Sequence, residues 1–145
     1  GNIVPGEKGL KLVSQHYDLM PYLTVAENVG KFISNINLAE KRKKVHELLE
    51  VVGLENYANV LPKNLSGGQQ QRVAIARALI TKPEIVFADE PTGNLDSNAS
   101  QAVMQLLKKC HQQYHLALVF VTHNESLCTY ASSVIELRDG RILSS

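Results

Sequence analysis

The sequence that decides the fold is Ile85-Val86-Phe87-Ala88-Asp89-Glu90, in which an unbroken apolar run ends in two adjacent acids. A short apolar run of this kind is typical of a strand in a parallel sheet that is covered on both faces. Ligand sites of parallel sheets gather at the carboxyl ends of the strands. Two acids are costly to desolvate there without a cation or a proton to hold, so Asp89 is a candidate Mg²⁺ ligand and Glu90 a candidate base for an attacking water. The alternative for this pair, taken alone, is an ordinary strand exit with two solvated acids.

Two other apolar segments end in polar residues in a similar way. Lys11–Ser14 has extended character and ends at Gln15, and Leu116–Thr122 is predicted to be a second buried strand that ends at His123. An imidazole at that place can hydrogen-bond a phosphate oxygen, although a histidine in a loop or a core is the commoner case. Helical patterns separate the three segments, so we predict an α/β fold with a parallel sheet.

The segment 23–64 is helical in its pattern and is predicted to be an all-helical insertion into the α/β part. Its first helix begins with a capping box at 24–27 and has one apolar face, which comprises Val25, Val29, Phe32, Ile33 and Ile36. A second helix runs from about Ala39 to Val52, and Gly53 follows it in the position of a left-handed C-terminal cap. Residues 134–143 contain two short apolar runs around an Asp-Gly turn, which predict a β-hairpin.

The segment Leu65-Ser66-Gly67-Gly68-Gln69 opens an alanine-rich helix that stops near Pro83. In the simpler interpretation, Ser66 and Gln69 form a capping box that satisfies free backbone N–H groups. Two consecutive glycines are more than a cap needs, and they expose backbone N–H groups at the positive end of the helix, where an anion would bind. The same atoms can therefore serve both as a cap and as a phosphate contact.

The composition is that of a globular protein, since 44% of the 145 residues are hydrophobic and 20% are charged. The 15 basic and 14 acidic side chains nearly balance, so we expect no nucleic-acid partner. Cys110 and Cys128 fit no metal or disulfide spacing and are expected to be reduced thiols of a cytoplasmic protein. The longest apolar run, Leu116–Val121, is far shorter than the ~20 residues of a membrane span.

Five short motifs together resemble those of the ATP-binding-cassette (ABC) ATPases. Leu65–Gln69 resembles the signature motif and Ile85–Glu90 the Walker B strand, while 94–96 resembles the D-loop. Gln15 resembles the Q-loop glutamine, and His123 resembles the switch histidine. Each motif alone is weak. The five nevertheless occur in the order and with the spacings of that family, and they cover nearly the whole chain.

The resemblance implies a partial P-loop NTPase (RecA-like) core that acts on ATP with Mg²⁺. Asp89 and Gln15 would lie at the metal, and the catalytic residues would be Glu90, His123 and Gln15. The cofactor-binding residues that the resemblance implies are Ser66, Gly67, Gly68, Gln69 and Asp96. In this family two subunits meet head to tail, and the signature motif of one closes over the ATP held by the phosphate loop of the other.

Two longer stretches indicate one type of ABC ATPase within the family. Leu19–Val29 and Glu90–Asp96 are similar to the lipoprotein-release and macrolide-export type of ABC ATPase, which pairs with a permease. The implied function is to bind and hydrolyse ATP and so power a transporter, at a cytoplasmic location peripheral to the inner face of the cell membrane. The implied permease contact is the loop Tyr17–Tyr22 with the helical subdomain, because exposed aromatic and Met side chains suit a partner groove. A local satellite core is the alternative for that loop.

Two other functions stay open. A non-transport ABC ATPase of the repair or chromosome-maintenance type would need a long coiled coil between Gln15 and Ser66, and that interval is too short for one. A translation factor of the superfamily usually has Asn-His-Leu-Asp where this chain has Gly93-Asn94-Leu95-Asp96. The other function is a catalytically dead regulatory module, against which the intact Glu90 and His123 argue.

No G-x-x-x-x-G-K-[ST] phosphate loop (Walker A) occurs in the 145 residues. We therefore expect residues 1–145 to be the C-terminal part of one ABC ATPase domain. The Q-loop strand and loop would lie in 11–22, the helical subdomain in 23–64, and the signature helix, Walker B strand, D-loop, switch histidine and C-terminal strands in 65–145. Such a chain is expected to bind nucleotide weakly, to be inactive alone, and to self-associate through uncovered strand edges and an uncovered apolar sheet face.

Overall fold

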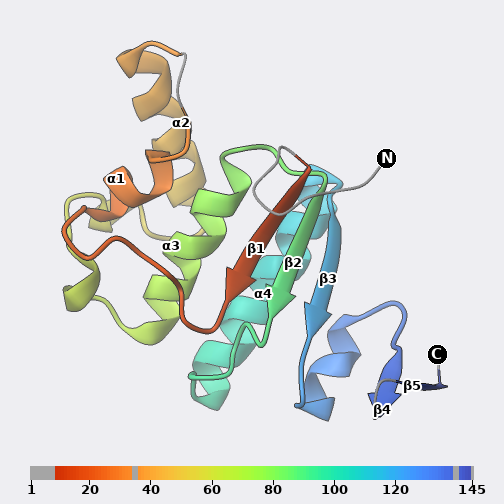
Figure 1. The fold of residues 1–145 in the computed structure, drawn as a ribbon. Coiled ribbons are helices and arrows are strands. Elements are labelled where there is room, and N and C mark those ends of the chain that lie inside the picture. The colour runs from red at the N-terminus through yellow and green to blue at the C-terminus, as the bar shows by residue number, and fades with distance from the viewer. Residues whose placement is uncertain (1–8, 34–35, 139–140, 145) are drawn as a thin grey trace.

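The computed structural model describes residues 9–33, 36–138 and 141–144, and it contains both strands and helices (Figure 1). The strands are β1 (Leu10–Ser14), β2 (Ile85–Asp89), β3 (Ala117–Val121), β4 (Glu136–Arg138) and β5 (Arg141–Ser144). The α-helices are α1 (Val25–Gly30), α2 (Leu38–Val51), α3 (Gly67–Leu79) and α4 (Ser97–Tyr114). Short 3₁₀ helices occur at Glu55–Tyr57, Pro62–Asn64 and Glu125–Tyr130.

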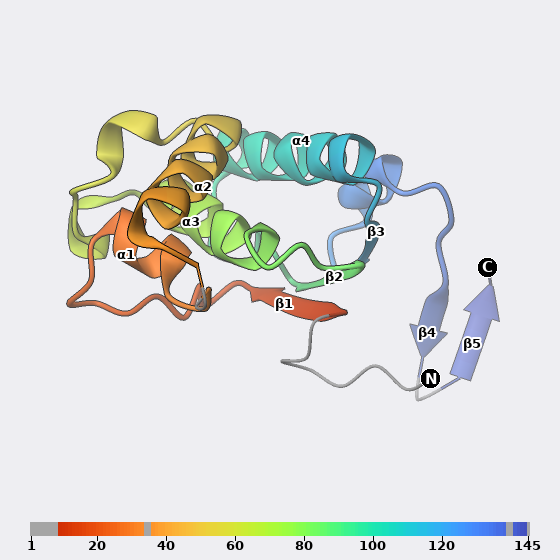
Figure 2. The same cartoon turned by 90° about the horizontal axis from the view of Figure 1, so that it is seen from above.

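Strands β1, β2 and β3 form a parallel sheet in that order, as predicted for the α/β part. The three strands end together, since Ser14, Asp89 and Val121 are neighbours in the register. Helices α3 and α4 lie on one face of this sheet (Figure 2). Parallel strands need long crossover connections, and here these connections contain the helices. The fold therefore brings the segments that follow three strands to one edge of the sheet.

The second face of the sheet carries apolar side chains that are exposed. Side chains alternate between the two faces of a strand, so the buried Val86 and Ala88 point to the helices, and Leu12, Val119 and Val121 point the other way. These last three are 59%, 46% and 45% exposed. The prediction that β3 is buried on both faces is therefore wrong for the residues described, because α3 and α4 pack on the same face. Ile85 and Phe87 of the central strand β2 are half-buried. The expected uncovered apolar face is present, and self-association stays a prediction.

The elements described between β1 and α3 are all helical, as predicted for 23–64. The predicted capping box of α1 is present: the Glu27 N–H donates to Thr24 Oγ1 at 3.2 Å, and the Thr24 N–H donates to Glu27 Oε1 at 3.0 Å. Helix α1 ends at Gly30, earlier than its apolar pattern predicts.

The last residue of α1 is in close contact with α2. A Cβ atom at Gly30 would lie 2.9 Å from Lys41 Cε and 3.1 Å from Val45 Cγ2, so α2 passes very close to the α1 backbone here. Phe32 lies beyond the helix and is 55% exposed, which contradicts its predicted place on the buried face. The Arg77 guanidinium lies 5.8 Å from the centre of the Phe32 ring, in a cation–π arrangement.

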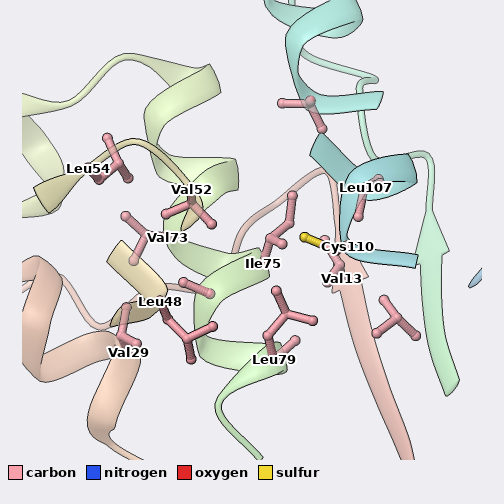
Figure 3. Close-up of a cluster of buried hydrophobic side chains, with 14 of the residues drawn as sticks. Val13, Val29, Leu48, Val52, Leu54, Val73, Ile75, Leu79, Leu107 and Cys110 are labelled. Carbon is pink, nitrogen blue, oxygen red and sulfur yellow. The ribbon is translucent and has the colours of Figure 1, made fainter. Parts of the chain in front are cut away.

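Helix α3 runs through one continuous hydrophobic core (Figure 3). Val73 and Ile75 of α3 are almost completely buried, as are Leu49 of α2 and Val103 of α4. Helix α3 packs against α1 and α2 of the helical segment and also against β1 and α4 of the α/β part. Full burial of one such side chain contributes about 1.5–3 kcal/mol. The helical segment and the sheet therefore share a core, and α3 packs against both of them.

Several smaller features match the sequence. Gly53 has a φ of +75°, the left-handed conformation predicted after α2. Strands β4 and β5 pair antiparallel as predicted, while the Asp-Gly turn between them lies outside the described residues. Cys110 and Cys128 are free, and burial raises the pKa of Cys110 to about 11, so this thiol stays neutral. Within the described ranges, no helix combines the length and the apolar character that crossing a membrane needs.

The shared core predicts that Leu49→Ala, which truncates a side chain that is 1% exposed, lowers the free energy of unfolding by about 2–5 kcal/mol. The loss combines the transfer of the removed atoms to water with the cavity that they leave. Leu38→Ala on the same helix is the matched control, because Leu38 is 60% exposed and its truncation should cost under about 0.5 kcal/mol. Urea denaturation followed by circular dichroism measures both variants, and equal losses would contradict this description of the core.

Candidate active site

Polar segments follow the carboxyl ends of all three parallel strands. Gln15 comes directly after β1, Glu90 after β2, and Thr122 with His123 after β3. Because the strands end in register, the structure brings these residues to one edge of the sheet, as predicted for Glu90 and His123.

The Glu90 carboxylate is held by the segment that follows β3. Its Oε1 accepts a hydrogen bond from the His123 N–H at 2.9 Å, and its Oε2 accepts one from Thr122 Oγ1 at 3.4 Å. His123 Nε2 lies 3.6 Å from the same Oε1. The Glu90 side chain is 22% exposed and the His123 side chain 97% exposed, so the carboxylate is sheltered and the imidazole is open to solvent. Sequence analysis missed Thr122, whose hydroxyl becomes significant only when β3 places it beside Glu90.

The backbone of Glu90 is strained. Its φ is +46°, in the left-handed region that glycine adopts freely and other residues rarely adopt. Its N–H donates to the Val121 carbonyl at 2.8 Å, so the chain extends the pairing with β3 by one bond before it turns. Strain of this kind costs about 1–3 kcal/mol, persists where the surrounding contacts enforce it, and clusters at functional sites. The turn places the carboxylate beside Thr122 and His123.

Gln15 packs on the turn that follows Glu90. Asn94 Nδ2 donates to the Gln15 carbonyl at 3.1 Å, and the Gly93 N–H donates to the Glu90 carbonyl at 3.0 Å. A methyl group at Gly93 would overlap the side-chain amide of Gln15. A side chain at this position would therefore have to displace the Gln15 amide, which lies against the Glu90 turn.

An arginine of α3 holds the loop after Gln15. Tyr17 and Asp18 in this loop have φ values of 60° and 54°, both left-handed. Arg77 Nη1 donates to the Asp18 carbonyl at 2.8 Å, and Nη2 donates to the Tyr17 carbonyl at 3.1 Å. Burial lowers the pKa of Arg77, and the Asp18 carboxylate opposes that shift. Sequence analysis did not single out Arg77, whose one signal is a cation within an alanine-rich helix.

The start of α3 has the predicted capping box. The Gln69 N–H donates to Ser66 Oγ at 3.1 Å, and the Ser66 N–H donates to Gln69 Oε1 at 2.9 Å. Gly67 also has a packing reason to be glycine, since a Cβ atom there would lie 3.0 Å from Tyr17 Oη and 3.1 Å from Leu95 Cδ2. The first turn of α3 therefore lies against both the loop after β1 and the turn after β2.

The other predicted phosphate-binding residues are not bonded to Glu90. In the part of the chain that the structure describes, no hydrogen bond joins 66–69 to Glu90 or His123. Asp96 Oδ1 accepts a hydrogen bond from the Ala99 N–H at 2.8 Å and caps α4. The cofactor-binding roles of 66–69 and Asp96 stay predictions.

Asp89 is the last residue of β2 and is exposed at the edge of the sheet. Its carboxylate and the Gln15 amide offer oxygen atoms, which Mg²⁺ prefers and combines with the phosphate oxygens of a substrate. Across the described ranges, no group of three or more His, Cys, Asp and Glu side chains could hold a metal ion. Oxygen donors of this kind fit an Mg²⁺ ion that also binds the phosphate oxygens of a substrate.

A hollow of about 580 Å³ opens beside Glu90 and His123. It lies between the turn after β2, the start of α4 and the segment after β3, and its lining includes the polar side chains of Thr92, Ser97, Gln101, Asn124 and Ser126. Hydroxyl, amide and imidazole groups are suitable partners for the oxygen atoms of a phosphate. The hollow can therefore take a hydrated, charged group next to the sheltered carboxylate.

Known proteins similar to this chain share one family. Residues 3–93 match the family model described as "ABC transporter". The chain is 45% identical over 135 residues to the lipoprotein-releasing system ATP-binding protein LolD of Syntrophotalea carbinolica, a match that covers 92% of this chain and 60% of LolD. It is 43% identical over 133 residues to the macrolide export ATP-binding/permease protein MacB 1 of Yersinia pestis, covering 90% of this chain and 20% of MacB 1.

A solved structure has the same fold. It is the ATP-binding cassette MJ0796 of Methanocaldococcus jannaschii, a dimer in a post-hydrolysis state bound to ADP and Pi. The TM-score is 0.79 at 41% identity, and the match covers 94% of this chain and 61% of MJ0796. The chain thus spans about 60% of the length of LolD and of MJ0796. Since the family model matches more than half of its residues, the chain belongs to the ABC transporter family of ATP-binding proteins.

Proposed function

We propose that the protein is an ATP-hydrolysing subunit that powers an ABC transporter of the lipoprotein-release or macrolide-export type. The observation that carries this proposal is the sheltered Glu90 carboxylate, which Thr122 and His123 hold at the edge where three parallel strands end. The similarity to LolD and MacB 1 supports the type of transporter.

In this proposal Glu90 is the base for the water that attacks the terminal phosphate of ATP. A general base needs a fixed orientation, and the His123 N–H provides it through one lone pair of Oε1. A carboxylate has about four acceptor sites, so others remain free to take the proton of the water. The exposed His123 imidazole would hydrogen-bond a phosphate oxygen, and Gln15 would orient the same water.

Mg²⁺ would be held by Asp89 and Gln15 together with the phosphates, and it would supply neutralisation of the phosphate charge. Asp89 is exposed at the end of β2, so a phosphate group can approach its carboxylate from solvent. The adjacent Glu90 is bonded to Thr122 and His123 instead. The two neighbouring carboxylates therefore have different surroundings, which suit Asp89 to bind the ion and Glu90 to activate the water.

A second copy of the subunit is proposed to complete each ATP site in a head-to-tail dimer. The segment 66–69 begins α3, whose N-terminus carries a positive partial charge and free backbone N–H groups. This segment would contact the ATP bound by the partner subunit, together with Asp96. The dimeric state of MJ0796 supports the arrangement.

The permease contact is proposed to be the loop Tyr17–Tyr22 with the helical segment 23–64. Tyr22 is 92% exposed and Met20 38% exposed, so these side chains are available to a partner. The loop backbone is nevertheless fixed, because the buried Asn28 accepts from the Met20 N–H at 2.8 Å and donates to the Met20 carbonyl at 3.1 Å. A fixed backbone with exposed apolar side chains suits a protein interface. The subunit would then lie at the cytoplasmic face of the membrane, peripheral to it.

The role of Glu90 predicts that Glu90→Gln in the full-length protein lowers the rate of ATP hydrolysis by about 10²–10⁴-fold, because an amide cannot accept the proton of the water. ATP binding is expected to persist, since the variant removes no phosphate donor. Phosphate release measures hydrolysis, and titration with a fluorescent ATP analogue measures binding. Glu84→Gln is the matched control, because Glu84 precedes β2 at the opposite end of the strand. Hydrolysis at the wild-type rate by Glu90→Gln would refute the proposed function.

The packing of Gln15 predicts that Gly93→Ala lowers kcat for ATP by about 10-fold or more, because the new methyl group displaces the Gln15 amide. The midpoint of thermal unfolding should change little, since the amide is the free end of a flexible side chain. The comparison is made in a Gln15→Ala background, where the methyl group has nothing to displace and should add little to the loss. An equal loss of kcat in both backgrounds would show that Gly93 acts by another route.

A further inference from the structure

Gln71 is a polar residue in the buried part of α3, and its side chain is 0% exposed. Its Nε2 donates to the Ser14 carbonyl at 3.1 Å and to the Pro91 carbonyl at 2.6 Å. Ser14 directly precedes Gln15, and Pro91 directly follows Glu90. One amide therefore joins the backbone next to two of the proposed catalytic residues.

The contact lies where the sheet stops holding the two segments together. The register between β1 and β2 ends at the pair Ser14 and Asp89. A parallel ladder fixes the relative position of two strands only over its own length. Gln71 joins the carbonyl of the last β1 residue to a carbonyl two residues beyond the end of β2. The hydrogen bonds of the Gln71 amide thus keep the segments after β1 and β2 aligned beyond the last paired residues of the sheet.

The partners determine the orientation of the Gln71 amide. Carbonyl oxygens take the hydrogen bonds of Nε2, and a flipped amide would place Oε1 against the same two oxygens. In the described structure Oε1 is buried and accepts no hydrogen bond. A buried acceptor without a partner lowers stability, and the two hydrogen bonds of Nε2 offset that cost. The reason for an amide at this position is therefore the pair of carbonyls that it joins, and not the packing of its apolar stem.

A second side-chain hydrogen bond, on the surface, joins the same two segments. Asn94 Nδ2 donates to the Gln15 carbonyl, one residue after the carbonyl that Gln71 holds. Asn94 lies in the turn after Glu90, so both amides connect the Gln15 segment to the Glu90 segment. Asn94 is exposed, and its removal leaves the core unchanged.

We propose that Gln71 is a positioning residue for ATP hydrolysis, whose amide sets the position of Gln15 relative to Glu90 so that both side chains reach the same attacking water. This inference rests on the proposed function. Both side chains must meet one water, and a misplacement of about 1 Å can lower a rate by about 10²-fold.

The test compares Gln71→Met with Gln70→Met in the full-length protein. Methionine has nearly the length of glutamine and has no donor, so each variant removes one amide and keeps most of the packing. Gln70 Nε2 also donates to two carbonyls, at 3.1 and 3.3 Å, but these belong to Pro62 and Leu65, which precede α3. We expect Gln71→Met to lower kcat by about 10-fold or more with KM for ATP within about 3-fold, and Gln70→Met to change kcat by less than about 3-fold.

Circular dichroism shows whether Gln71→Met folds. If it does not, Asn94→Ala tests whether the contact between the two segments affects kcat. We expect Asn94→Ala to lower kcat by about 3-fold or more with an unchanged midpoint of thermal unfolding. Where both variants fold, the double variant should lose little more activity than Gln71→Met alone, because both amides act through the position of Gln15. Two residues with separate structural roles would give effects that multiply.

The outcomes distinguish this inference from the proposed function. If Gln71→Met folds and has the wild-type kcat, the inference is overturned and the proposed function stays in place. If Gln71→Met does not fold, a wild-type kcat in Asn94→Ala has the same meaning. A wild-type protein that does not hydrolyse ATP, or one whose rate Glu90→Gln leaves unchanged, overturns the proposed function and with it the reaction that Gln71 would serve.

Discussion

The burial of α3 between the helical segment and the sheet governs the rest of the architecture. Val73 and Ile75 are 0% and 1% exposed, and they lie in the core that both parts share. A shift of α3 would open cavities toward both parts at once, which close-packed interiors resist. The polar groups on this helix therefore hold fixed positions. Ser66 at its N-terminus, Gln71 in its first half and Arg77 near its end move only as one element.

Two polar side chains of α3, Gln71 and Arg77, pair with backbone groups at strand ends or in a loop. Gln71 donates to carbonyls at the exits of β1 and β2, and Arg77 donates to the two left-handed residues of the loop after β1. Left-handed non-glycine residues cost about 1–3 kcal/mol each, and the charge-assisted bonds of Arg77 offset part of that cost. In the proposed dimer, residues 66–69 of this helix contact the ATP of the partner subunit. The same helix is hydrogen-bonded to the segments after β1 and β2, which serve the ATP of its own subunit.

Those parts of the fold that have local causes could be predicted from the sequence. The capping boxes at Thr24 and Ser66 join residues three positions apart, and the apolar runs of β1, β2 and β3 stand out against helical patterns. The extent of α1 and the burial of Phe32 were predicted wrongly, because an apolar pattern does not determine where a helix ends or which side chains tertiary contacts cover. The coverage of both sheet faces was predicted wrongly as well, since the pattern of a strand does not say on which face a helix packs.

Glu90 and His123 could be named from the sequence because apolar runs mark strands, and the residues that follow parallel strands share one edge of the sheet. Gln15 was named through the resemblance to the family. The order of the motifs also identified the family, since that order is a property of the chain itself. How these side chains are held could be learned from the folded molecule only. Gln71 contacts carbonyls 57 and 20 residues away, and Asn94 contacts one 79 residues away. Such bonds leave no periodic trace in the sequence, because an amide can pair with any carbonyl that folding brings within about 3 Å.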